Sequence, residues 1–145
     1  MDNEVFHANH TARTGRLIKK ADHKAHVNPF SWEEKALFEN AVKKHFPRYY
    51  PLFLTALRTG MRAGELVALQ SGDIDFNGNF IEVRRSYVRG RISTPKSGKA
   101  PPRRVDMSKG LRKALKEHLT ARKREALQKG WGPLPRWLFY NETGG

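Results

Sequence analysis

The chain has 145 residues, which is enough for one domain with a modest core and short for two. Its 28 lysines and arginines exceed its 14 acidic residues, and the formal net charge of +14 predicts a polyanionic partner, most often nucleic acid. No basic stretch carries a long apolar face, so we expect no membrane partner. Cysteine is absent, which excludes disulfides, thiolate zinc sites and cysteine nucleophiles. With no apolar run long enough to cross a membrane and no signal peptide, we expect a cytoplasmic protein associated with the nucleoid.

Residues 1–29 are polar and basic, and most of them follow no helical or strand period. We interpret this stretch as a flexible connector that leads to one folded domain over residues 30–145. Two His-x-x-His pairs lie in the connector, His7 with His10 and His23 with His26. Because no cysteine and few acidic residues are nearby to complete a ligand set, we expect no metal site.

Three helices are predicted after the connector. Residues 31–34 (SWEE) form a capping box, and the helix that follows ends before Pro47. Pro51 suits the first turn of a second helix, which Gly60 would cap. Apolar spacing predicts a short third helix over about residues 63–70.

The period changes after the third helix. Asn77-Gly78 indicates a tight turn, and β-branched and aromatic residues over 80–92 and 104–107 indicate three strands. A long basic helix is predicted over about residues 109–128. The predicted fold class is therefore α+β, with a helical pair and a short helix, a small three-stranded antiparallel sheet, and the long basic helix.

The first candidate site lies over residues 59–66 (TGMRAGEL), which place Arg62 at the start of a short helix and Glu65 three residues later. The guanidinium fork of an arginine at a helix start can bind a phosphate, and a glutamate one turn on can hold the fork in place. The same spacing also fits an ordinary helix start with an intrahelical ion pair. Both interpretations remain open on spacing alone.

The second candidate site is the stretch over residues 84–104, which holds eight basic residues and no acidic one. Its aromatic and β-branched residues place these charges on strands and turns, where they suit contact with a nucleic-acid backbone or groove. A solvated surface sheet is the alternative interpretation.

In this order and spacing, the two motifs resemble the tyrosine recombinase, or phage integrase, family. Residues 57–76 (LRTGMRAGELVALQSGDIDF) are similar to the family's first catalytic box, and residues 80–108 are similar to its three-stranded sheet with a lysine-bearing hairpin. The resemblance covers about residues 30–142. It implies an integrase-type catalytic domain that cuts and rejoins DNA strands through a 3′-phosphotyrosyl bond, without a metal or another cofactor. The implied partners are double-stranded DNA and other recombinase protomers.

The resemblance also assigns roles. Arg62 matches the first catalytic arginine, which clamps the scissile phosphate, and Glu65 would support it. Lys96 matches the general acid that protonates the departing 5′ oxygen, with Lys99 as the alternative. The remaining basic residues of the sheet would contact the DNA backbone; these are Arg84, Arg85, Arg89, Arg91, Lys99, Arg103 and Arg104.

The family pattern continues with a His-x-x-Arg box and a nucleophilic tyrosine that have no counterpart in these 145 residues. His118 lacks an arginine at the required spacing, and we predict it to be a surface residue. None of the four tyrosines stands in the required context; they are Tyr49, Tyr50, Tyr87 and Tyr140. We therefore expect this chain to be inactive alone. Two further hypotheses are a basic DNA-binding module that is not catalytic and an RNA-binding domain.

Overall fold

The computed structural model describes residues 28–93 and 102–140. The chain divides into two units after Ser31, and the described helices and strands belong to the second unit, which begins at Trp32. The predicted connector over residues 1–29 lies almost wholly outside the described residues, so its boundary stays a prediction. None of the described helices is long and apolar enough to cross a membrane.

The first two helices form where the caps and prolines predict them. Helix α1 spans Trp32–His45, and α2 spans Tyr50–Thr59. Gly60 ends α2 in the left-handed conformation, with φ of 61°, and its N–H donates to the carbonyl of Ala56. The two helices contact each other, and the rings of Phe38 and Phe53 meet edge to face with centroids 5.6 Å apart.

Helix α3 spans Ala63–Val67 and is shorter than predicted. The backbone beyond it bonds elsewhere: the carbonyl of Leu69 accepts the N–H of Leu138, and Gln70 forms an isolated β-bridge with Trp137. Because a distant segment uses these backbone groups, the helix does not continue to residue 70. A single 3-10 turn, η3, follows over Ser71–Asp73.

The strands form two small antiparallel sheets. In the first, β1 (Ile74–Asp75), β2 (Phe80–Val83) and β5 (Arg103–Asp106) lie in the order β1-β2-β5. In the second, β3 (Ser86–Val88) pairs with β4 (Arg91–Ser93). The sequence predicts three strands but not this division, because a strand of two residues such as β1 is too short to show alternation.

The β3–β4 hairpin turns through only two residues, Arg89 and Gly90, which both have positive φ values of 48° and 78°. Positive φ at both central positions is typical of a tight hairpin turn whose twist matches the flanking strands. The hairpin therefore presents Arg89 at its tip.

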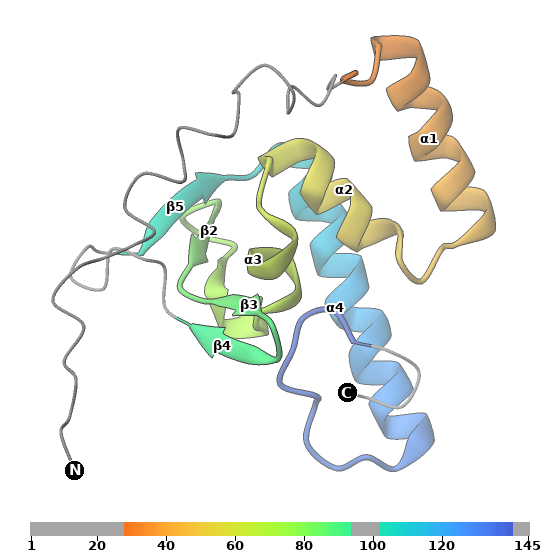
Figure 1. Ribbon diagram of the computed structural model, residues 1–145. Coiled ribbons are helices and arrows are strands. Elements are labelled where there is room, and N and C mark those ends of the chain that lie inside the picture. Colours follow the sequence, from red (N-terminus) through yellow and green to blue (C-terminus); the bar gives the residue numbers. More distant parts are fainter. Residues whose placement is uncertain (1–27, 94–101, 141–145) are drawn as a thin grey trace, which may run out of the picture. The chain divides into compact units, whose positions relative to one another are not determined.

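Helix α4 (Lys109–Lys129) closes the core against α2 and the first sheet. Ser108 caps it, since its Oγ accepts the N–H of Leu111 at 3.3 Å. In Figure 1, α4 runs beside α2, and α3 lies near the β3–β4 hairpin. The buried apolar residues come from nearly every element; they are Leu54, Met61, Leu66, Leu69, Ile74, Ile81, Val83, Met107, Leu111, Leu115 and Leu138.

Gly64 sets how closely α3 approaches β3. A Cβ atom at this position would lie 2.5 Å from the carbonyl oxygen of Tyr87 and 2.7 Å from the Oγ of Ser86. Alanine normally stabilises a helix relative to glycine. We expect Gly64→Ala instead to lower the free energy of unfolding by roughly 1–3 kcal/mol, because the backbone of β3 must move.

Urea denaturation checks this expectation. The control is Gly72→Ala, because a Cβ atom there would have no neighbour within 4 Å, and its stability should stay close to that of the native chain. A Gly64→Ala variant as stable as the native chain would show that α3 does not depend on this close approach.

Candidate functional site

Arg62 and Glu65 form the centre of the first candidate site. Arg62 precedes α3, and its backbone N–H donates to Oε2 of Glu65 at 2.9 Å, while its Nη1 lies 3.4 Å from Oε1. The Glu65 side chain is only 6 % exposed, whereas that of Arg62 is 85 % exposed. A buried carboxylate thus holds the backbone of an arginine whose guanidinium faces solvent.

Arg103 joins this pair from a distant part of the chain. It is the first residue of β5, and its Nη2 donates to Oε2 of Glu65 at 2.8 Å. One carboxylate oxygen therefore binds both the backbone of Arg62 and the guanidinium of Arg103. The structure brings these three predicted site residues together, although the prediction assigned Arg103 to contact with DNA.

Asp73 is a second buried carboxylate, and it binds the backbone of Gln70 and the side chain of Arg85. Its side chain is 2 % exposed, and its carboxylate accepts the Gln70 N–H at 2.8 Å. Arg85 donates three hydrogen bonds to it, at 3.0 to 3.2 Å. The sequence analysis did not single out Asp73, although the Asp-Ile-Asp of the first box was the available signal. Arg85 therefore has a structural role, and its contact with DNA stays a prediction.

Glu82 neutralises two other predicted DNA contacts. Arg84 pairs with its Oε2, and Arg104 lies 3.3 Å from its Oε1. The hydrogen bond from Arg84, and after it that from Arg104, lower the pKa of Glu82 below its ordinary value. The Arg104 guanidinium also lies over the ring of Phe80, 4.4 Å from its centroid. These two arginines carry less uncompensated charge than the sequence suggests.

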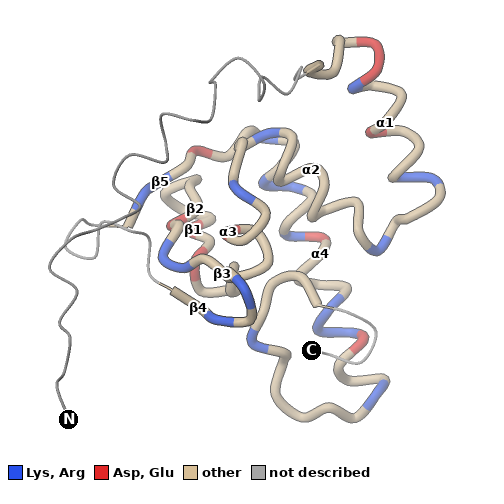
Figure 2. Tube along the Cα trace, in the orientation of Figure 1, with Lys and Arg blue, Asp and Glu red and all other residues tan. Residues whose placement is uncertain are grey.

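Arg89 and Arg91 are exposed on the β3–β4 hairpin, and neither forms an ion pair with any residue in the described ranges. Figure 2 shows basic residues on this hairpin, on β5 and along α4. Lys96 and Lys99 lie outside the described residues, so their roles stay predictions. Among the predicted DNA-contact residues that the structure describes, Arg89 and Arg91 are therefore the ones whose positive charge no acidic residue neutralises.

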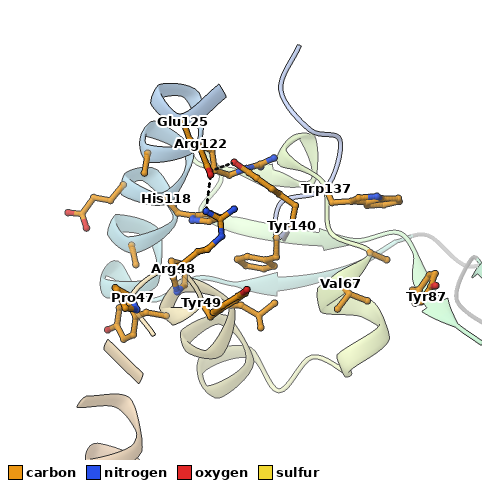
Figure 3. Close-up of a pocket in the computed structure, with 18 of the residues that line it drawn as sticks. Pro47, Arg48, Tyr49, Val67, Tyr87, His118, Arg122, Glu125, Trp137 and Tyr140 are labelled. Carbon is orange, nitrogen blue, oxygen red and sulfur yellow. Dashed lines mark hydrogen bonds and ion pairs between the residues drawn. The ribbon is translucent and has the colours of Figure 1, made fainter. Parts of the chain in front are cut away.

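A pocket of about 990 Å³ is lined by residues of α2, α3, the β3–β4 hairpin, α4 and the segment over 137–140 (Figure 3). Its walls are mostly apolar, and an ion pair joins Arg48 to Glu125 at 2.9 Å. Tyr140 donates to the same carboxylate at 2.8 Å. None of the predicted site residues that the structure describes lines this pocket, although Val67 of α3 and Tyr87 and Ile92 of the hairpin do.

The prediction that His118 is a surface residue is wrong. His118 is half-buried, and its Nε2 lies 3.0 Å from the carbonyl oxygen of Leu138; burial lowers its pKa below the ordinary value. Arg122, which the sequence analysis placed on a basic helix, is 2 % exposed and donates to the carbonyl of Pro135 at 2.8 Å. His118 and Arg122 attach the segment over residues 135–138 to α4. Helical periodicity does not predict such contacts, because they join residues that are far apart in the sequence.

Within residues 28–93 and 102–140, no group of three or more His, Asp or Glu side chains is placed to hold a metal ion. The two His-x-x-His pairs of the connector lie outside the described residues.

The chain is similar to known recombinases over most of its length. The phage integrase family matches residues 32–144. A XerC-like tyrosine recombinase of Caldanaerobacter subterraneus subsp. tengcongensis is 33 % identical over 116 residues, which cover 72 % of this chain and 29 % of the relative. The chain therefore spans under a third of that relative's length.

Two solved structures have a similar fold. The Tn1549 transposon integrase in complex with transposon right-end DNA has a TM-score of 0.69 and 21 % identity, covering 88 % of this chain and 43 % of the integrase. XerA recombinase has a TM-score of 0.58 and 26 % identity, covering 81 % of this chain and 37 % of the recombinase.

The pocket cluster predicts a pH dependence of stability. The hydrogen bond from Arg48, and after it those from Tyr140 and Lys129, lower the pKa of Glu125 from 4.5 to about 2. Because the folded pKa is depressed, this stabilisation is present above pH 4.5 and is lost as the pH falls towards 2. We expect Glu125→Gln to remove roughly 1–2 kcal/mol of stability at pH 6, after allowance for solvent screening, and less at pH 3.

Urea unfolding at pH 6 and pH 3 measures the difference. Glu117→Gln is the matched control, since Glu117 is an exposed glutamate on the same helix. The account of the cluster is contradicted if Glu125→Gln and Glu117→Gln lose the same stability at both pH values.

Proposed function

Because this chain belongs to the phage integrase family of tyrosine recombinases, we propose that it binds duplex DNA and supplies Arg62 to the scissile phosphate of a site-specific recombinase. The observation that carries the proposal is the exposed Arg62 guanidinium, whose backbone is held by the buried carboxylate of Glu65. The solved integrase in complex with transposon right-end DNA supports DNA as the partner.

Arg62 would act on the phosphate electrostatically. Its guanidinium presents several N–H donors in a planar fork that matches two non-bridging phosphate oxygens. Negative charge on these oxygens must be stabilised when a nucleophile attacks the phosphorus, and a pre-positioned cation lowers that barrier without reorganising. A weak 3.4 Å contact with Glu65 leaves most of its donors available for this task.

Lys96 would donate a proton to the departing 5′ oxygen, with Lys99 as the alternative donor. This role comes from the family resemblance alone, since both lysines lie outside the described residues. The nucleophilic tyrosine and the remaining cationic groups would come from the rest of a complete catalytic domain, and other protomers would bind the partner DNA site. Attachment to chromosomal DNA would place the protein at the nucleoid.

The DNA-contact surface that we propose is centred on Arg89 and Arg91 of the hairpin. These guanidiniums are exposed and have no acidic partner among the described residues, so they can neutralise phosphates at little cost. Arg84 and Arg104 would contribute less because each must also share Glu82. Lys99 belongs to the same proposed surface on sequence grounds only.

An RNA-binding function is less well supported. Single-stranded RNA readers stack bases on aromatic side chains that share one sheet face. Phe80 and Tyr87 are the aromatic residues that could stack bases, but they lie on different sheets. Phe80 is on β2 beneath the Arg104 guanidinium, and Tyr87 is on β3. Competition between duplex DNA and single-stranded RNA for the chain would separate the two functions.

The salt dependence of duplex binding tests the proposed surface. If about six phosphates are neutralised, log K against log salt should have a slope of about −5. The double variant Arg89→Ala with Arg91→Ala should flatten this slope by about 2, since each phosphate contact contributes about 0.9. The matched control is the double variant Lys123→Ala with Arg124→Ala, which removes two positive charges from the exposed face of α4. It should flatten the slope by less than about 1.

Two results would count against the hairpin surface. One is equal flattening in the two double variants, which would indicate binding through total charge rather than through the hairpin. The other is no measurable binding at low salt by a chain whose fold is intact.

We also propose that these 145 residues do not cleave DNA by themselves. Burial raises the pKa of Tyr50 and of Tyr140 above the ordinary value, and each hydroxyl hydrogen-bonds a glutamate, Glu39 and Glu125 respectively. These interactions oppose formation of a nucleophilic phenolate. A nicked suicide duplex incubated with the chain should give no covalent adduct on a denaturing gel. An adduct that disappears in Arg62→Ala would refute this proposal.

A further inference from the structure

Glu65 is shared unequally between two arginines. Its Oε2 accepts the Arg103 Nη2 at 2.8 Å, whereas its Oε1 lies 3.4 Å from the Arg62 Nη1. Charge-assisted hydrogen bonds are strongest at about 2.7–2.9 Å, so Arg103 supplies the stronger guanidinium contact. The same Oε2 also accepts the Arg62 backbone N–H at 2.9 Å.

The position of Arg103 on β5 directs its side chain towards Glu65. In the β2–β5 ladder Val83 pairs with Arg103 and Glu82 pairs with Arg104. Successive side chains of a strand point to opposite faces, which directs Arg103 towards Glu65 and Arg104 towards Glu82 and Phe80. Two adjacent arginines therefore have different partners, and only one of them reaches the Arg62 site.

We propose that Arg103 is a positioning residue for Arg62, acting through Glu65, rather than only a contact to the DNA backbone. The inference rests on the proposed function of Arg62 as the phosphate clamp. By neutralising the buried carboxylate, Arg103 keeps Glu65 from drawing the Arg62 guanidinium inward. It also fixes the oxygen that holds the Arg62 backbone.

This arrangement links two elements that are far apart in the sequence. Arg62 is the N-cap residue before α3, and Arg103 is the first residue of β5. Their shared carboxylate therefore fixes the start of α3 relative to the edge of the first sheet. A displacement of about 1 Å in a catalytic group is enough to lower a reaction rate strongly. Loss of Arg103 should therefore affect the phosphate site even though Arg62 itself is intact.

Hydrogen exchange in the ¹⁵N-labelled chain tests the inference without DNA. In Arg103→Ala the backbone amide of Arg62 should exchange about tenfold faster, the effect expected for loss of one charge-assisted hydrogen bond. The core amide of Leu115 exchanges through global unfolding and should accelerate less, by the loss of overall stability alone. The matched control, Arg104→Ala, removes the neighbouring charge from the other face of β5 and should leave the exchange of Arg62 as in the native chain.

Duplex affinity provides the second measurement. Arg103→Ala should weaken binding several-fold in the native background and have no effect when Arg62 is already alanine. An unchanged Arg62 amide, together with the same loss of affinity in both backgrounds, would make Arg103 a DNA contact only and overturn the inference.

Two safeguards keep the experiment decisive. If the Leu115 amide accelerates in Arg103→Ala as much as that of Arg62, the milder Arg103→Gln variant replaces it, since glutamine keeps an N–H donor and loses the charge. It should still accelerate exchange at Arg62, and an unchanged amide overturns the inference. If the native chain does not bind DNA, the proposed function fails, and the exchange of the Arg62 amide still decides the role of Arg103.

Discussion

A carboxylate that is nearly removed from water is stable only when charged or polar groups bind its oxygens. Three donor groups bind the Glu65 carboxylate. The Arg62 backbone, the Arg62 guanidinium and the Arg103 guanidinium all converge on it. The close approach of Gly64 to β3 also constrains the position of this helix. The exposed position of Arg62 therefore follows from packing and ion pairing together, and the proposed phosphate site depends on both.

The net charge of the chain gives an incomplete picture of its surface. Asp73 holds Arg85, Glu82 is shared by Arg84 and Arg104, and Glu65 holds Arg103. Four arginines of the basic stretch are therefore compensated in the folded chain. The exposed hairpin arginines have no such partner among the described residues. The surface proposed to bind DNA is thus narrower than the sequence suggests, because folding brings acids against some of its bases.

The sequence predicts α1, α2 and α4 well, since capping residues, prolines and helical spacing are local signals. It also identifies Arg62 and Glu65, whose motif lies within one helical turn. It does not predict the end of α3, the buried state of Arg122 or the pairing of Glu65 with Arg103. Each of these depends on segments far apart in the sequence, and no local pattern records which segments meet.

Glu65 and Arg103 should stabilise the chain as a pair, and a double-mutant cycle on the free energy of unfolding measures their coupling. The cycle combines Glu65→Gln, which keeps the shape and removes the charge, with Arg103→Ala. The account predicts that the two losses are not additive, with a coupling of about 1–2 kcal/mol. Additive losses within about 0.3 kcal/mol would contradict it, because the two side chains would then contribute independently.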